Sequence, residues 1–77
     1  MKLSTRQAAK MIMHRLQENA ADLKRPALNI THALQDCGLN IPLTLADRNR
    51  MWSWFLSPES DARVLSRFTF VLDGYVK

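Results

Sequence analysis

Three prolines constrain the fold of this chain more than any other feature of its sequence. Pro26, Pro42 and Pro58 follow one another at intervals of 16 residues, but the residues around them do not match, so the interval is not an internal repeat. Proline is tolerated in the first turn of a helix and breaks a helix interior. The prolines therefore divide the chain into four pieces, each about the length of an ordinary helix.

The first piece has the period of an amphipathic helix from about Thr5 to Lys24. At about 100° per residue, its small and apolar side chains fall within one broad stripe. The members of this stripe are Thr5, Ala8, Ala9, Ile12, Leu16, Ala20 and Leu23. Ser4 precedes the stripe and belongs to a residue type that caps helix N-termini, so the predicted helix has a plausible start.

Two shorter helices are predicted in the middle of the chain. The first covers about 26–37, and Gly38 follows it where many helices end in the left-handed conformation. The second begins with Thr44–Asp47, a near capping box in which Asp replaces the usual Glu, and runs to about Leu56. Residues 39–43 are apolar enough to form a loop that lies against the core.

The last piece has a helical period as well. Ser57-Pro58-Glu59 combines a capping serine, a proline at the first helical position and an acidic residue that suits the helix dipole. Residues 67–72 also alternate like a strand ahead of the turn dipeptide Asp73-Gly74, but too few residues follow for a return strand. We therefore predict an all-α fold, one domain over 1–77 built as a small bundle of about four short helices, with a strand at 67–72 as the alternative.

The single cysteine, Cys37, bears on the compartment. An intramolecular disulfide is impossible, and secreted domains of this size usually depend on several, so a reducing compartment is favoured. The first residues contain no apolar run typical of a signal peptide, and no stretch approaches the roughly 18 apolar residues of a membrane span. We expect a cytoplasmic protein without a membrane partner.

Residues suited to catalysis or to metal binding are scarce. A structural zinc site needs four ligands at short paired spacings, whereas His32 and Cys37 lie about 140° apart around a helix. Two isolated glycines cannot build a phosphate-binding loop, and no nucleophile lies in a recognisable motif. We expect no catalytic residue, no metal, no cofactor and no enzymatic activity. Catalysis would need a site shared between copies of the chain.

Two pairs of aromatic residues suggest a surface with a function. Trp52 and Trp54, and likewise Phe68 and Phe70, are two positions apart, which places the members of each pair about 200° apart on a helix. One packing face cannot take both members of a pair. Either the third helix is buried on nearly all sides and Phe70 is an isolated exposed aromatic, or Trp52 or Trp54 joins Phe70 in an exposed apolar patch.

The second interpretation predicts a protein-binding function. Arg48 and Arg50 flank the tryptophans, Phe70 falls among further arginines, and aromatic residues with arginine are the usual composition of a binding hot spot. We expect a regulator or inhibitor that contacts another protein through the third and fourth helices, or that self-associates as a homodimer. The predicted protein-binding residues are Trp52, Trp54, Phe70, Arg48 and Arg50.

The charge distribution supports an alternative function. The net charge is +4, and its whole excess lies in residues 1–25, which carry six basic and two acidic side chains. A solvated helix face accounts for this excess, but the same face would suit a nucleic-acid phosphate backbone. The candidate nucleic-acid-binding residues are Lys2, Arg6, Lys10, Lys24 and Arg25.

A degenerate helix-turn-helix over 30–55 belongs to this alternative. Arg48, Asn49 and Arg50 would then reach base edges from the second helix of the motif. The connection Gly38–Thr44 is longer than the turn of about three or four residues that the motif needs. Protein binding is therefore our first hypothesis and nucleic-acid binding the second.

Overall fold

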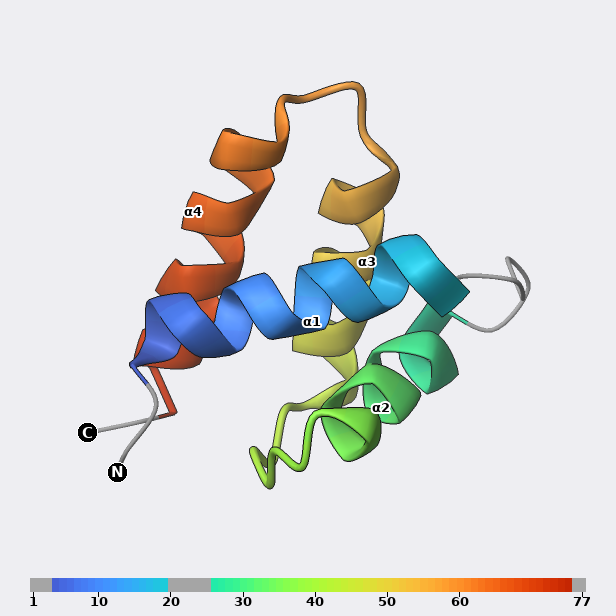
Figure 1. Ribbon diagram of the computed structural model, residues 1–77, viewed down its shortest axis with the longest axis vertical. Helices are drawn as coiled ribbons and strands as arrows, with labels where there is room; N and C mark the ends of the chain where they lie inside the picture. The colour runs from blue at the N-terminus through green and yellow to red at the C-terminus, as the bar shows by residue number, and fades with distance from the viewer. Residues whose placement is uncertain (1–3, 20–25, 76–77) are drawn as a thin grey trace.

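Four α-helices make up most of the described chain (Figure 1). The structure is a computed structural model that describes residues 4–19 and 26–75. The helices are α1 (Thr5–Asn19), α2 (Pro26–Asp36), α3 (Leu45–Leu56) and α4 (Asp61–Asp73). The described ranges contain no strand, so the all-α prediction is confirmed. The alternative of a strand at 67–72 is wrong because these residues lie within α4.

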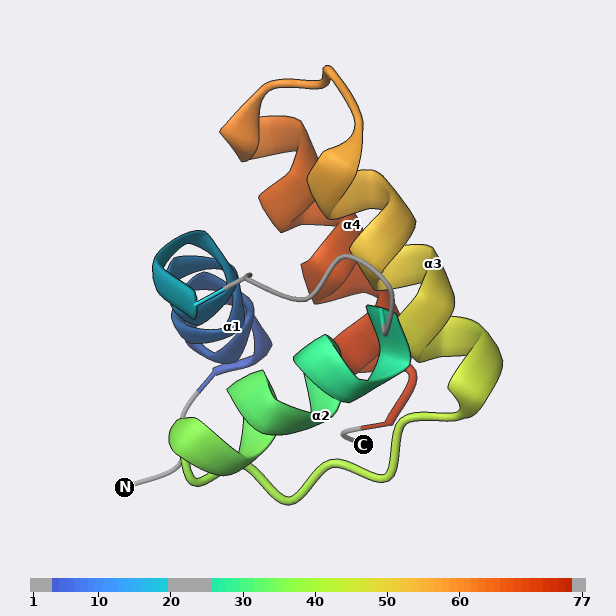
Figure 2. The same ribbon diagram turned by 90° about the vertical axis from the view of Figure 1, so that its right-hand side faces the viewer.

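The helices contact one another in a ring. α1 packs against α4 and α2, and α3 packs against α2 and α4. Figures 1 and 2 show α3 and α4 side by side, with α1 running across α4. Thr5 Oγ1 donates to Asp73 Oδ1, and Gln17 Nε2 donates to Asp61 Oδ2 at 3.4 Å, so each end of α1 meets the opposite end of α4. α1 and α4 therefore run in opposite directions and cross at an angle.

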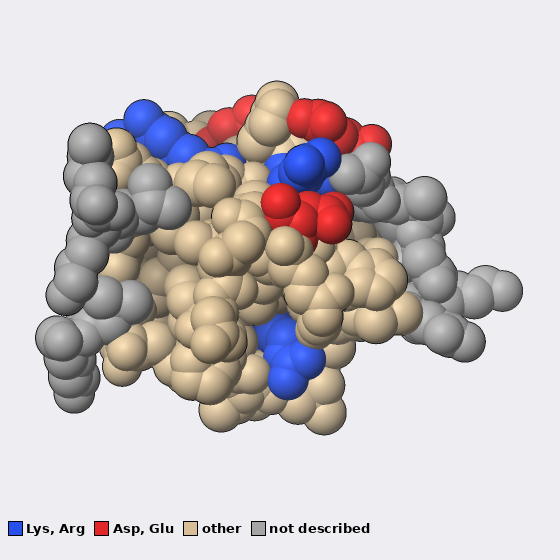
Figure 3. All heavy atoms as spheres, turned by 60° about the horizontal axis from the view of Figure 1, so that its bottom comes forward, with Lys and Arg blue, Asp and Glu red and all other residues tan. Residues whose placement is uncertain are grey.

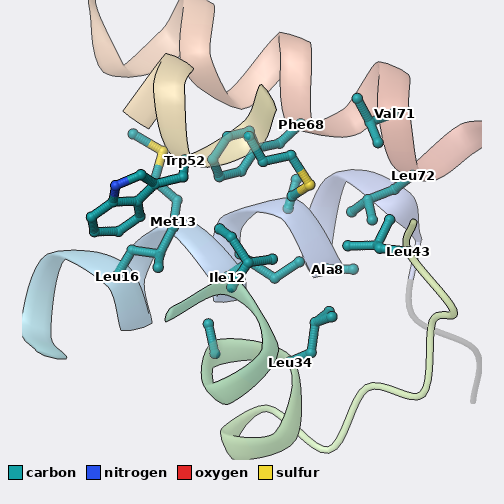
Figure 4. Close-up of a cluster of buried hydrophobic side chains, with 14 of the residues drawn as sticks. Ala8, Ile12, Met13, Leu16, Leu34, Leu43, Trp52, Phe68, Val71 and Leu72 are labelled. Carbon is teal, nitrogen blue, oxygen red and sulfur yellow. The ribbon is translucent and has the colours of Figure 1, made fainter. Parts of the chain in front are cut away.

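Side chains from all four helices and from the α2–α3 loop form one hydrophobic core (Figure 4). In the predicted stripe of α1, Ala8, Ala9, Ile12 and Leu16 are buried as expected. Leu43 is buried in the loop before α3, which confirms that the apolar segment packs on the core. The largest fully buried side chains are Phe68, Ile12, Leu16, Ile30, Met51 and Leu72.

Local signals in the sequence fix most of the helix ends. The Ser4 hydroxyl accepts from the Gln7 backbone N–H at 3.1 Å, while Gln7 Oε1 accepts from the Ser4 N–H at 3.0 Å, a reciprocal capping box. Thr44 caps α3 by accepting from the Asp47 N–H at 3.1 Å. Gly38 has a φ of 69° after the end of α2, as predicted.

The predicted start of α4 is wrong by one turn. Ser57 does not cap α4, because its backbone N–H and its hydroxyl both bond to the Trp54 carbonyl and complete the end of α3. Ser60 is the N-cap of α4, and its hydroxyl accepts from the Arg63 N–H at 3.4 Å. Pro58 consequently lies in the α3–α4 connection rather than in the first turn of a helix.

Candidate functional site

The two phenylalanines of α4 lie in opposite environments. Phe68 is fully buried, whereas the Phe70 side chain is 76% exposed. Residues two apart on a helix point about 200° apart, so burying Phe68 beneath α1 turns Phe70 toward solvent. Phe70 is the most exposed large apolar side chain in the described residues. The predicted exposure of Phe70 is confirmed.

Trp54 lies beside Phe70 on the neighbouring helix and contacts two arginines. Its side chain is half-buried and packs partly against the core. The guanidinium carbons of Arg50, from α3, and of Arg67, from α4, each lie 5.5 Å from the centre of a Trp54 ring. A guanidinium at this distance is attracted to the negative face of an aromatic ring. Trp54 therefore holds two cationic groups at the α3–α4 boundary.

These side chains border an open hollow of about 380 Å³. None of its lining residues comes from α1 or α2, and none carries a carboxylate. We call this hollow the docking surface, and it is lined by Arg50, Trp54, Arg63, Ser66, Arg67 and Phe70.

The arginines of the docking surface are only partly neutralised. Arg67 Nη2 bonds to Glu59 Oε1 at 2.9 Å, and Arg63 Nη1 lies 3.9 Å from the same carboxylate oxygen. Arg50 bonds to Asp47 Oδ1. The Arg63 side chain is 68% exposed, and Arg67 Nε is buried without a hydrogen-bond partner. Two carboxylates thus serve three guanidinium groups.

A second open hollow, of about 620 Å³, lies on the other side of Phe70. It shares Arg50 and Phe70 with the docking surface, but two carboxylates, Asp47 and Asp73, are among its lining residues. The exposed phenylalanine therefore separates an arginine-rich hollow from one that contains acidic groups. A partner that covers both hollows would therefore meet basic groups on one side of Phe70 and acidic groups on the other.

Asp47 belongs to a small hydrogen-bond network that joins the start of α3 to the end of the described chain. The Tyr75 hydroxyl accepts from the Thr44 backbone N–H at 3.0 Å and donates to Asp47 Oδ2. The Tyr75 hydrogen bond is the main cause that lowers the pKa of Asp47, and Arg50 lowers it further. Only half of the predicted capping box between Thr44 and Asp47 is therefore formed directly, because the Thr44 N–H donates to Tyr75, which bonds to Asp47 in turn.

The structure brings together three of the five predicted protein-binding residues. Trp54, Phe70 and Arg50 lie on the docking surface. Of the two tryptophans, either of which was expected to join Phe70, Trp52 does not, because it is 4% exposed and points toward α1 (Figure 4). Arg48 does not flank the patch either. Its Nη1 donates to Thr31 Oγ1 at 2.7 Å and its Nε donates to the Leu43 carbonyl at 3.2 Å, so Arg48 ties the loop and α3 to α2.

Two residues of the docking surface were not among the predicted protein-binding residues. Arg63 and Arg67 precede Phe70 by seven and three positions, which places them near it on one side of α4. The helical period of the sequence alone places both arginines on the Phe70 side of this helix. Their contacts with Glu59 and Trp54 depend on the α3–α4 turn, which the sequence does not specify.

The basic residues of the alternative function are only partly described. Arg6 and Lys10 are exposed on α1, while Lys2, Lys24 and Arg25 lie outside the described residues. Figure 3 shows one face on which Lys and Arg side chains form separate groups, with acidic and other side chains between them. The helix-turn-helix geometry is not found, because residues 37–44 separate α2 from α3.

Other chemistry-bearing residues do not gather in the described ranges. No group of three or more His, Cys, Asp and Glu side chains with metal-binding geometry occurs there. Cys37 is a half-buried free thiol whose pKa is raised mainly by burial. No helix among those described is long and apolar enough to cross a membrane. Comparison with protein-family models, curated proteins and solved structures finds no match for this chain.

Proposed function

We propose that this protein binds another protein through the docking surface and acts as a regulator or inhibitor without chemistry of its own. The observation that carries the proposal is the 76% exposure of Phe70 beside the hollow that Trp54 and three arginines line. Burying a phenylalanine side chain is worth about 1.5–3 kcal/mol, so covering Phe70 is a source of binding energy.

The composition of the docking surface agrees with this function. Aromatic residues and arginine are enriched at the energetically important centres of protein interfaces, whereas single exposed apolar residues are ordinary. Here the exposed phenylalanine does not stand alone, because a tryptophan and three arginines adjoin it. Trp54 is also held in place by its core contacts and by the guanidinium groups of Arg50 and Arg67. A side chain that is already ordered loses less conformational entropy on binding.

Affinity capture from the source cell tests the proposal. Wild-type protein and the variants Phe70→Ala and Leu56→Ala are immobilised in parallel, and each is exposed to lysate with and without nuclease treatment. Leu56 is the matched control because it is an apolar side chain, 54% exposed, that does not line the hollow. We expect a protein that binds the wild type and Leu56→Ala and is lost with Phe70→Ala.

Two outcomes would contradict the proposal. One is a set of captured proteins that does not change with Phe70→Ala. The other is that nuclease removes every partner, which would favour the nucleic-acid alternative. Light scattering of the purified protein identifies self-association, in which case the captured partner is a second copy of the chain.

A further inference from the structure

We infer that the docking surface accepts a peptide segment in which a carboxylate side chain stands next to an apolar side chain. The inference rests on the proposed function and adds the chemistry of the partner. Its grounds are the exposed guanidinium of Arg63, which has only a distant ion-pair partner among the described residues, and the change of charge across Phe70.

The apolar part of the partner would contact the aromatic rings. Phe70 and Trp54 contribute rings to the hollow, one from each helix, and Ser66 is the small side chain of the lining. Arg63 and Phe70 are seven residues apart on α4, which corresponds to about 10 Å along the helix axis. An extended peptide covers this distance with about three residues. One apolar anchor with a neighbouring charged residue therefore matches the size of the hollow.

The carboxylate of the partner would meet the arginines. A guanidinium has five N–H donors. Arg67 bonds to Glu59 through Nη2, and its Nε is buried and cannot be reached from solvent, so the exposed guanidinium of Arg63 is the one that a partner would contact. The distance of 3.9 Å from Arg63 to Glu59 leaves the guanidinium of Arg63 largely to solvent. Because Glu59 Oε1 bonds to Arg67 at 2.9 Å and lies 3.9 Å from Arg63, a second carboxylate that approached Arg63 from solvent would find its donors unused. Guanidinium and carboxylate groups are well matched for paired hydrogen bonds.

The acidic groups beyond Phe70 argue against a nucleic-acid strand. A single strand carries a phosphate at every nucleotide and binds along an extended basic groove. A strand that passed Phe70 would leave Arg63 and Arg67 and meet Asp47 and Asp73, with Arg50 as the one arginine among the described residues of the second hollow. A peptide avoids this repulsion because its charge changes from residue to residue. We therefore expect acidic side chains at one end of the bound segment and neutral or basic side chains past the apolar anchor.

Selection from a random peptide library tests whether the docking surface prefers an acidic side chain next to an apolar one. The probe is a library of peptides of about ten residues, a few times the span of the hollow. It is selected on the folded wild-type protein, and the binding of an enriched peptide is then measured by titration calorimetry. We expect enriched sequences with Asp or Glu beside a large apolar residue. Replacing the acid by its amide should weaken binding about tenfold, because a charge-assisted hydrogen bond is lost.

Protein variants localise the contact. Arg63→Gln should weaken the acidic peptide about fivefold and leave its amide counterpart nearly unchanged, since an exposed ion pair contributes modestly. Arg6→Gln on α1 is the control for net charge and should change neither. Arg63 is the variant of choice because its side chain is 68% exposed and its loss leaves the core intact, whereas Arg67 also contacts Trp54 and Glu59. Circular dichroism verifies the fold of each variant.

The outcomes distinguish a failure of this inference from a failure of the proposed function. Enriched peptides that depend on Phe70 but carry no acid, or that ignore Arg63→Gln, would overturn this inference and leave the proposed function standing. Peptides whose binding does not depend on Phe70 would count against both. Tighter, Arg63-dependent binding of a single-stranded oligothymidine would replace the peptide by a nucleic acid and overturn the inference as well.

Discussion

At the scale of single residues, the aromatic pairs decide what is core and what is surface. The helical period requires that Phe68 and Phe70 face different ways, and the same holds for Trp52 and Trp54. It does not say which member faces inward. Trp52 is buried because α1 lies against that side of α3, where Met13 and Leu16 adjoin the indole (Figure 4). This contact between distant parts of the chain could not be predicted from the spacing of the tryptophans.

The phenylalanines of α4 supply a matched pair of substitutions. Phe68→Ala should lower the free energy of unfolding by about 3–5 kcal/mol, because it empties a fully buried site. Phe70→Ala should change it by no more than about 0.5 kcal/mol, since the ring is mostly in water. Urea denaturation measures both values. If Phe68→Ala does not fold, Phe68→Leu, with an expected loss of about 1 kcal/mol, takes its place. If Phe68→Ala and Phe70→Ala lowered the free energy of unfolding equally, the exposure of Phe70 would be contradicted.

Asp47 makes the stability of the protein depend on pH. The folded state lowers the pKa of Asp47, chiefly through the Tyr75 hydroxyl, so the charged carboxylate stabilises the fold. This contribution is complete above the ordinary carboxyl value of about 3.9 and is lost as the pH falls through the lower, folded-state value. Asp47→Asn should therefore cost about 1 kcal/mol near pH 7, and the cost should shrink as the pH falls below the ordinary carboxyl value.

Urea denaturation of wild type and Asp47→Asn at several pH values checks this expectation. Tyr75→Phe is the complementary variant, because it keeps the ring and removes the hydroxyl that bonds to Asp47. NMR titration of Asp47 should show a higher pKa in that variant. A constant difference between wild type and Asp47→Asn at every pH would show that the carboxylate has no stabilising charge.

At the scale of elements, the sequence predicted the helices better than their ends. Three of the four helix starts follow from local residue types, as the capping contacts of Ser4 and Thr44 illustrate. The start of α4 does not, because Ser57 and Ser60 are both suitable caps three positions apart. Ser57 is used to end α3, and the choice depends on how tightly the chain turns between the two helices. The α3–α4 turn also positions Glu59 beside Arg67.

Replacing Ser60 and, as a control, Ser66 by alanine tests whether Ser60 caps α4. Ser60→Ala should reduce the free energy of unfolding by about 0.5 kcal/mol, because the Arg63 N–H loses its side-chain acceptor at 3.4 Å and keeps the Ser60 carbonyl at 3.1 Å. Ser66→Ala, in the exposed middle of α4, should be neutral or stabilising by a few tenths of a kcal/mol, since alanine is the better helix former. Thermal unfolding followed by circular dichroism gives the comparison. A larger loss at Ser66 than at Ser60 would refute the assigned cap.

At the scale of the whole molecule, the four helices share one hydrophobic core. Each helix packs on two others, and the buried side chains form one cluster. Four helices were predictable from prolines and periodicity, but their pairing was not, because amphipathic helices of similar length can pack in several orders. The docking surface is a product of that pairing: Trp54 and Arg50 come from α3, while Arg67 and Phe70 come from α4.

Such a core should unfold as a unit. For a chain of this length we expect a free energy of unfolding of about 4–12 kcal/mol and a urea slope near 1 kcal/mol per molar. In a Trp54→Phe background, tryptophan fluorescence follows the contact of Trp52 with α1, and far-UV circular dichroism follows all helices. The two urea transitions should coincide, because removing α1 from Trp52 also uncovers Phe68 and the rest of the cluster. Phe70→Ala should keep them coincident. A fluorescence change that precedes the loss of helix would mean that α1 separates while α2, α3 and α4 persist.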